Sequence, residues 1–156
     1  GKVMKKKKLM LTVCLIISLI FSTGCSSTSE DEMLEFFADR AENFEKDDYS
    51  HIKYTKLARH PKDYETRDIK IRGDVFQAIE NTDDDYTTLL LRVGGDWDKI
   101  MLVYIYNEFL DTRVFEGDDV RCYGLFAGLQ SYENFFDMTQ TVPMMYADKI
   151  YILNDE

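Results

Sequence analysis

Apolar residues gather in five short segments in the last two thirds of the chain, and in the first of these they alternate with polar residues. These segments are residues 68–80, 86–93, 99–106, 118–128 and 143–153. Runs of this length that are rich in β-branched and aromatic residues are typical of strands. In the first run, Ile69 and Val75 share one face and Gly73 interrupts it, which indicates a β-bulge or a sharp bend. The pattern therefore predicts five strands, of which the first is long and bent.

The number and spacing of these strands favour a mainly β fold that closes into a small OB-type barrel over residues 61–156. The connections are residues 81–85, 94–98 and 107–117 and a longer predicted loop at residues 129–141, and a Gly117-Asp118 turn leads into the fourth strand. OB folds have five strands, whereas a β-sandwich, which is the alternative, usually has about seven.

A helical segment is predicted ahead of the barrel, over residues 32–60. Apolar residues recur in its first part, residues 32–46, at helical spacing with acidic residues between them. They are Met33, Phe36, Phe37, Ala41 and Phe44. Because the polar face is acidic rather than basic, docking on the barrel is favoured over binding to a membrane surface. A short helical turn is expected at residues 51–59, ending before Pro61.

The N-terminal block, residues 1–24, has the pattern of a secretory signal peptide. Four lysines, Lys5 to Lys8, precede an apolar run of thirteen residues, 9–21. A membrane-spanning helix needs about 20 apolar residues, whereas a basic region followed by a shorter apolar region and small residues forms an export signal. Four adjacent lysines also disfavour a buried core helix. Residues 1–3, which precede Met4, are interpreted as an upstream remnant.

The end of this signal, Ser22-Thr23-Gly24-Cys25, resembles the lipobox of bacterial lipoproteins, although Ser22 stands where an aliphatic residue is usual. The resemblance implies that a diacylglycerol, with fatty acyl chains such as palmitate, is attached to the Cys25 sulfur. It also implies cleavage between Gly24 and Cys25. Two acyl chains suffice for stable anchoring, so residues 25–31 would be the lipidated cysteine and a polar tether on the extracytoplasmic face of the cell membrane. The alternative is a soluble secreted chain with an incidental cysteine.

The part of the chain from Cys25 onward carries a large negative charge. Its 132 residues, a usual size for one domain, include 14 basic and 29 acidic side chains, which gives a net charge of −15. Binding to a phosphate backbone needs clustered Lys and Arg, so this balance disfavours nucleic acid and anionic lipid as main partners. It leaves attraction to cations or to a basic partner. Cys122, the one cysteine left for the fold, lies in a predicted strand, which favours a buried thiol over a reactive one.

No stretch carries a catalytic or cofactor motif. His51 and His60 are the two histidines, and neither belongs to the ligand spacing of a zinc site. Asp83, Asp84 and Asp85 could bind Ca²⁺ through oxygen ligands, but they lack the EF-hand spacing. Aspartates also favour hairpin turns for backbone reasons. We therefore expect no enzyme activity, no cofactor and no metal, with this aspartate run as a weak metal candidate.

Aromatic residues gather where OB folds bind their ligands. Tyr104 and Tyr106 alternate on the third predicted strand. Trp97 lies in the turn before that strand, and Tyr132 and Phe135 lie in the loop before the fifth. OB folds bind ligands on strands 2 and 3 and with the loops that join strands 1–2 and 4–5, and aromatic rings there stack on bases or sugars. We predict a peptide, glycan or protein site at these residues. The alternative is that the rings complete the core or cover the barrel ends.

Four segments resemble a known family of small lipoproteins. They read YTKLARHPKDY, IKIRGDVFQAIE, VFEGDDVRCYGLFAGLQSY and VPMMYADKI. They look like the Firmicute-type, Gram-positive lipoproteins whose C-terminal domain is called tRNA-anti-like, and the resemblance spans about residues 54–153. It implies an OB barrel on a surface lipoprotein and carries over no catalytic residues. The name of the domain suggests anticodon binding, against which the net charge argues.

The sequence thus predicts a lipid-anchored extracytoplasmic OB-fold module that binds an unknown protein, peptide or glycan. The alternative is an accessory subunit or inhibitor that regulates a basic surface partner through its acidic face. A hydrolase whose site is assembled only on folding is a third and weak interpretation.

Overall fold

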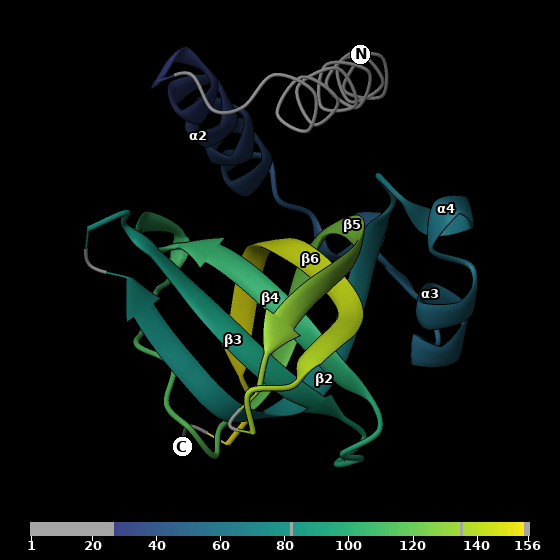
Figure 1. Ribbon diagram of the computed structural model, residues 1–156. Helices are drawn as coiled ribbons and strands as arrows, with labels where there is room; N and C mark the ends of the chain where they lie inside the picture. The colour runs from purple at the N-terminus through teal and green to yellow at the C-terminus, as the bar shows by residue number, and fades with distance from the viewer. Residues whose placement is uncertain (1–26, 82, 135, 155–156) are drawn as a thin grey trace. The chain divides into compact units, whose positions relative to one another are not determined.

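The computed structural model of the chain describes residues 27–81, 83–134 and 136–154 (Figure 1). The predicted signal peptide, the cleavage and lipidation site at Gly24 and Cys25, and Phe135 lie outside the described residues, so the predictions made for them stay predictions. The chain divides into two units, one that ends at Phe44 and one that begins at Glu45.

In its described part, the N-terminal unit is the helix α2 (Ser27–Glu42). The helix includes residues that the sequence pattern assigns to a polar tether, and it ends before the expected residue 46. Glu30 in the first turn and Arg40 in the last complement the helix dipole. Phe36 and Phe37 are buried, and their rings meet edge to face at 5.1 Å. None of the described helices combines the length and the apolar character that a membrane crossing requires.

The described residues of the second unit form a closed barrel. Its strands are β2 (Asp68–Asn81), β3 (Tyr86–Val93), β4 (Ile100–Tyr106), β5 (Asp119–Glu133) and β6 (Thr139–Ile152). Neighbouring strands follow the order β2-β3-β4-β6-β5, and β5 pairs back to β2. The β4–β6 pair is parallel, with Tyr104 opposite Tyr146, and the other pairs of the barrel are antiparallel. This connectivity confirms the predicted five-stranded OB-type barrel.

Alternation along each strand places one apolar set inside the barrel. Leu89 and Leu91 of β3 and Val103 of β4 are fully buried members of this core cluster. Cys122 of β5 belongs to the same cluster, which confirms the predicted buried thiol. Burial raises the pKa of the Cys122 thiol, so the group stays protonated and unreactive.

The bend in β2 was expected at Gly73 but lies a few residues further along the strand. The register between β2 and β3 shifts between Val75 and Gln77, which leaves Phe76 as the bulged residue. At Gly73 a Cβ atom would lie 2.7 Å from the carbonyl oxygen of Arg92. The glycine therefore allows a close approach of two backbones, and the adjacent bulge curves β2 so that it pairs with both β3 and β5.

Short elements precede the barrel within the second unit. They are η1 (Lys46–Asp48), β1 (Ser50–His51), α3 (Tyr54–Arg59) and α4 (Pro61–Tyr64). α3 lies within the expected helical turn, and its Leu57 is fully buried in the core cluster. It ends before Pro61, as predicted, but Pro61 itself begins α4, because proline suits the first turn of a helix.

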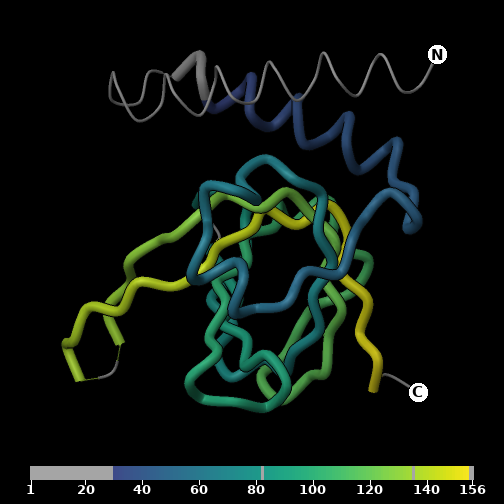
Figure 2. The backbone as a smooth tube through the Cα atoms, turned by 90° about the vertical axis from the view of Figure 1, so that its right-hand side faces the viewer, coloured from purple at the N-terminus to yellow at the C-terminus, as the bar shows by residue number. Residues whose placement is uncertain are grey.

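The connection between β5 and β6 differs from the sequence prediction. Residues 129–141 are not a loop throughout, since β5 continues to Glu133 and β6 begins at Thr139. The hydroxyl oxygens of Ser131 and Thr141 are 2.9 Å apart across the two strands. Cross-strand pairs of hydroxyl side chains such as this one stabilise a hairpin. The hairpin projects from the side of the barrel (Figure 2).

Candidate binding face of the barrel

The outer surface of β3, β4 and β6 carries a second apolar cluster. Leu90 pairs with Leu102 across β3 and β4, and Leu102 pairs with Met144 across β4 and β6. Their neighbours along each strand face the barrel core, so these three side chains point outward. They are nevertheless buried, because aromatic residues pack around them. The aromatic residues packed against this cluster are Phe76, Tyr104, Tyr132 and Tyr146.

Tyrosines from three neighbouring strands form a row beside this cluster. The ring centroids of Tyr86 and Tyr104 are 5.5 Å apart in an edge-to-face arrangement. Those of Tyr104 and Tyr146 are 6.0 Å apart, and the two rings are nearly parallel at 27°. Tyr106 lies opposite Tyr86 in the β3–β4 register, and its ring meets Phe109 at 5.9 Å. These separations are typical of favourable aromatic pairs, so each ring helps to hold the orientation of its neighbour.

Trp97 lies at another edge of the same cluster and is 62% exposed. Its ring centroid is 5.1 Å from that of Phe76, the bulged residue of β2. The guanidinium carbon of Arg92 lies 4.5 Å above the indole, and the Arg92 Nε donates to Asp74 Oδ2 at 2.7 Å. The indole is thus held by a ring and a cation while much of its surface faces solvent.

Two further tyrosines lie outside β3 and β4: Tyr132 packs against the outer cluster, whereas Tyr54 packs against the barrel core. Tyr132, on the β5–β6 hairpin, donates its hydroxyl proton to Gln140 Oε1 at 2.7 Å. Tyr54 of α3 donates to the carbonyl oxygen of Ile100, the first residue of β4, at 2.8 Å. Burial raises the pKa of both phenols, and for Tyr54 the nearby Tyr132 acts in the same direction. Both side chains are therefore neutral donors near neutral pH.

Burial also raises the pKa of two tyrosines in the row, Tyr104 and Tyr146. It raises the pKa of Tyr146 to about 12, with Tyr104 and Tyr106 adding to the effect. The pKa of Tyr104 is raised by burial first and then by Tyr86. Tyr104 and Tyr146 therefore present neutral rings and hydroxyls rather than groups poised for proton transfer at neutral pH. Such an arrangement can stack on a flat ring and can form hydrogen bonds.

The structure places most of the predicted site residues around one surface. Tyr104, Tyr106 and Tyr132 border or extend the outer cluster, with Trp97 at its edge, whereas Phe135 lies outside the described residues. We call the combined surface the aromatic face, and it consists of Tyr86, Trp97, Tyr104, Tyr106, Tyr132 and Tyr146. Sequence reasoning missed two of these, Tyr86 and Tyr146. The role of the face in binding stays a prediction.

The remaining candidates form no evident site in the part of the chain that the structure describes. Asp84 accepts a hydrogen bond from Asn81 Nδ2 at 2.8 Å, and Asp85 adopts a left-handed φ of 55°, so both serve the turn between β2 and β3. Asp83 is exposed in the same turn. Within the described ranges, no three His, Cys, Asp or Glu side chains are placed to hold a metal ion. His51 and His60 are exposed.

Solved structures share the fold of the barrel. No protein-family model matches the sequence, and no curated protein matches it. The chain is similar to a putative aspartyl-tRNA synthetase from Leishmania major, with 13% identity over 73% of this chain and a TM-score of 0.50. It spans only 22% of the length of that synthetase. At this identity the likeness shows the fold alone.

Two further matches are smaller proteins. One is a mitochondrial single-stranded DNA-binding protein from S. cerevisiae, with 16% identity over 57% of this chain and 95% of that chain and a TM-score of 0.38. The other is an OBody bound to hen egg-white lysozyme, with 14% identity over 69% of this chain and 98% of that chain and a TM-score of 0.47.

These matches correct one prediction about partners. tRNA synthetases and single-stranded DNA-binding proteins occur among the similar structures, so the prediction that disfavours nucleic acid as a partner is wrong. The prediction relied on a net charge summed over the whole chain. A single-strand site depends instead on stacking rings and on the charge of one groove.

Proposed function

We propose that the protein is a lipid-anchored, extracytoplasmic binding module, rather than an enzyme, and that its ligand docks on the aromatic face. The observation that carries the docking proposal is the packing of Tyr86, Tyr104 and Tyr146, from three strands, beside one apolar cluster. The anchor rests on the lipobox resemblance of Ser22 to Cys25. The corresponding location is the outer face of a Gram-positive membrane, as in the Firmicute-type lipoproteins that the sequence resembles.

The chemistry of the aromatic face favours a ligand with flat rings. Neutral phenols and an exposed indole offer π-faces, and stacking of a base on such a side chain contributes about 1–3 kcal/mol. Sugar rings and aromatic side chains of a peptide offer comparable surfaces. Because similar structures include single-stranded DNA-binding proteins, single-stranded nucleic acid belongs with glycans and aromatic-rich peptides in the set of ligands to be tested.

A binding titration of the full chain in a neutral detergent tests this proposal. The ligands are a single-stranded oligonucleotide, an oligosaccharide and an aromatic-rich peptide. Tyr104→Ala and Trp97→Ala should each weaken the best ligand about fivefold to a hundredfold, because each removes one stacking ring.

Leu153→Ala is the matched control, since it removes a partly exposed apolar side chain beyond the end of β6. It should leave the affinity unchanged, and circular dichroism checks that each variant folds. If Tyr104→Ala and Trp97→Ala bind every ligand as tightly as the control does, the aromatic face is not the binding site.

A second candidate function, regulation of a basic surface partner, is favoured by exposed carboxylates on the connections between strands. Asp83, Asp85, Asp98 and Glu116 are all exposed. Association through such groups weakens steeply as ionic strength rises, because the screening length falls to about 8 Å near physiological salt. Docking on neutral rings responds little to salt. A salt titration of the affinity for the physiological partner therefore separates the two functions.

A further inference from the structure

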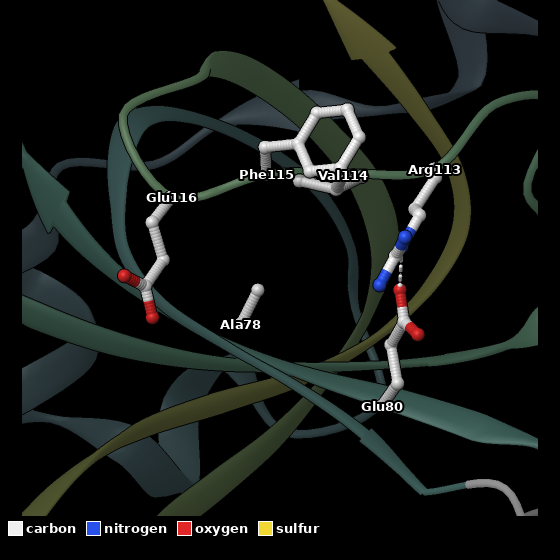
Figure 3. Close-up of a pocket in the computed structure, with 6 residues that line it drawn as sticks. All are labelled: Ala78, Glu80, Arg113, Val114, Phe115 and Glu116. Atoms are coloured by element: carbon white, nitrogen blue, oxygen red, sulfur yellow. Dashed lines mark hydrogen bonds and ion pairs between the residues drawn. The ribbon is translucent and has the colours of Figure 1, made fainter.

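A hollow of about 490 Å³ opens between β2 and the loop that leads into β5 (Figure 3). Ala78 and Glu80 of β2 line one side, and residues 113–116 of the loop line the other. Its volume lies within the range of about 300–1,000 Å³ that is typical of ligand pockets. None of its lining residues belongs to the aromatic face.

The hollow lies on the inward side of β2. Ala78 pairs with Leu89, which faces the barrel core, and Ala78 packs against that core. β2 pairs with β5 only as far as Asp74 and Asp119. Beyond this point the loop before β5 runs beside β2 in place of a strand, and the hollow occupies the space between them.

Backbone hydrogen bonds hold the loop to β2. The Val75 amide donates to the Asp118 carbonyl oxygen at 2.8 Å, and the Gly117 amide donates to the Val75 carbonyl oxygen at 2.7 Å. The Asp118 carboxylate accepts a further bond from the Phe115 amide at 2.8 Å. Val114 is buried in the core cluster. The walls of the hollow are therefore preformed.

The charges in the lining are two carboxylates and one guanidinium. The Arg113 Nε donates to Glu80 Oε1 at 2.5 Å, and the guanidinium carbon lies 5.4 Å from the centre of the Phe115 ring. Glu116 stands on the opposite wall from this ion pair (Figure 3). Because Arg113 neutralises Glu80, the lining as a whole keeps one negative charge. Phe115 is 57% exposed, so its ring is accessible from solvent.

We propose that this hollow binds the cationic side chain of a lysine or arginine in a basic peptide segment of a partner. The Glu116 carboxylate supplies the countercharge, and the exposed Phe115 ring, one face of which lies near Arg113, offers its other face to the cation. Ala78 and Val114 provide apolar surface for the aliphatic stem of the side chain. The net charge of −15 after Cys25 attracts a segment of this kind. The inference is independent of the proposed function, because the aromatic face takes no part in it.

A methyl-detected NMR titration of the full chain in a neutral detergent tests the inference. The probe is a short peptide that alternates lysine and glycine, and a glutamine–glycine peptide is the neutral control. The methyl signals of Ala78 and Val114 should shift saturably with the lysine peptide and not with the neutral peptide, because both methyl groups line the hollow.

Matched variants then separate the hollow from the general attraction of an acidic chain. Glu116→Gln and Phe115→Leu should each weaken the lysine peptide about twofold to fivefold, since each removes one surface-exposed charge or cation–π contact. Asp98→Asn removes the same charge from an exposed turn outside the hollow, and it should change the affinity less. Trp97→Ala should leave the Ala78 and Val114 shifts intact, which distinguishes this site from the aromatic face.

Two results would overturn the inference. The first is an equal weakening by Glu116→Gln and Asp98→Asn, which would mean that the peptide responds only to overall charge. The second is a lysine peptide that leaves the Ala78 and Val114 signals in place. The side chains of Phe115 and Glu116 are both exposed, so neither substitution should disturb the fold. The methyl spectrum of each free variant checks this.

Discussion

Burial raises the pKa of three tyrosines of the aromatic face, Tyr104, Tyr132 and Tyr146, further above neutral pH. The pKa of Tyr146 is raised to about 12, by burial first and then by Tyr104 and Tyr106. The pKa of Tyr104 is raised in the same direction, although its hydrogen bond with Thr88 acts against the shift. Neutral phenols add no charge to an already acidic chain. The face can therefore stack on ligands of either sign.

The shift at Tyr146 predicts a loss of stability at alkaline pH. Below its usual pKa of 10 this tyrosine is protonated in both the folded and the unfolded chain. Between pH 10 and about 12 the unfolded chain releases the proton while the folded chain keeps it, so the free energy of unfolding falls as pH rises through this window. The fall attributable to Tyr146 is about 2–3 kcal/mol.

Urea unfolding at increasing pH measures this effect. In Tyr146→Phe the decline should be shallower than in the unchanged chain, because the ionisable group is absent from both states. Equally steep declines in the two proteins would mean that the phenol of Tyr146 is not buried as the structure has it.

At the scale of elements, the backbones of β5 and β6 approach each other closely at Gly124. A Cβ atom there would lie 2.1 Å from the Tyr146 carbonyl oxygen and 2.7 Å from the Ala147 Cα. The register of the β5–β6 pair also shifts between Tyr123 and Gly124. The glycine and the bulge together let β6 pair with β5 on one side and with β4 on the other.

Gly124→Ala should therefore destabilise the barrel by about 2–4 kcal/mol, because the added methyl group meets backbone atoms that must move. Gly94→Ala is the control, since its φ of +66° is strained for alanine but its surroundings are open. It should cost about 1–2 kcal/mol. Chemical denaturation measures both variants, and equal losses would contradict the close approach at Gly124.

The same elements show how far the sequence predicts the fold. The β-branched, aromatic and apolar content of residues 86–93 predicted β3, as observed, and its inward residues recur at every second position. The β5–β6 hairpin escaped prediction because most residues at positions 130–141 are polar and show no regular apolar alternation. These residues form strands because β5 and β6 pair with each other there, as the contact between Ser131 and Thr141 shows.

The residues of the candidate site also fall into those that the sequence could predict and those that it could not. Tyr104 could be predicted, because the strand order of an OB fold indicates which strand carries the outer face. Tyr86 and Tyr146 could not be assigned to the site, because their positions opposite or beside Tyr104 depend on the registers of three strands. Register is a property of the packed sheet rather than of one segment.

At the scale of the whole molecule, a net charge is a weak guide to the partner. The −15 charge after Cys25 argued against nucleic acid, yet a putative aspartyl-tRNA synthetase is among the similar structures. The aromatic face and the exposed carboxylates on the connections between strands are two separate surfaces. Each surface therefore needs its own ligand test.

The proposed membrane anchor makes a prediction about the intact cell. Cys25→Ala removes the sulfur to which the diacylglycerol would attach, so the variant should stay uncleaved and lose its shift into the detergent phase on phase separation. Ser26→Ala, the neighbouring change, should behave like the unchanged chain. A Cys25→Ala protein that keeps the normal processed size and the normal partition would show that this cysteine is not lipidated.

The most direct test of the binding-module account is photo-crosslinking in intact cells from a benzoylphenylalanine at position 104. The same group at position 153, beyond the end of β6, provides the comparison. The account predicts one dominant crosslinked product from position 104, weakened by Trp97→Ala, and little of that product from position 153. No product from position 104, or the same product in equal yield from position 153, would contradict the claim that the aromatic face binds the ligand.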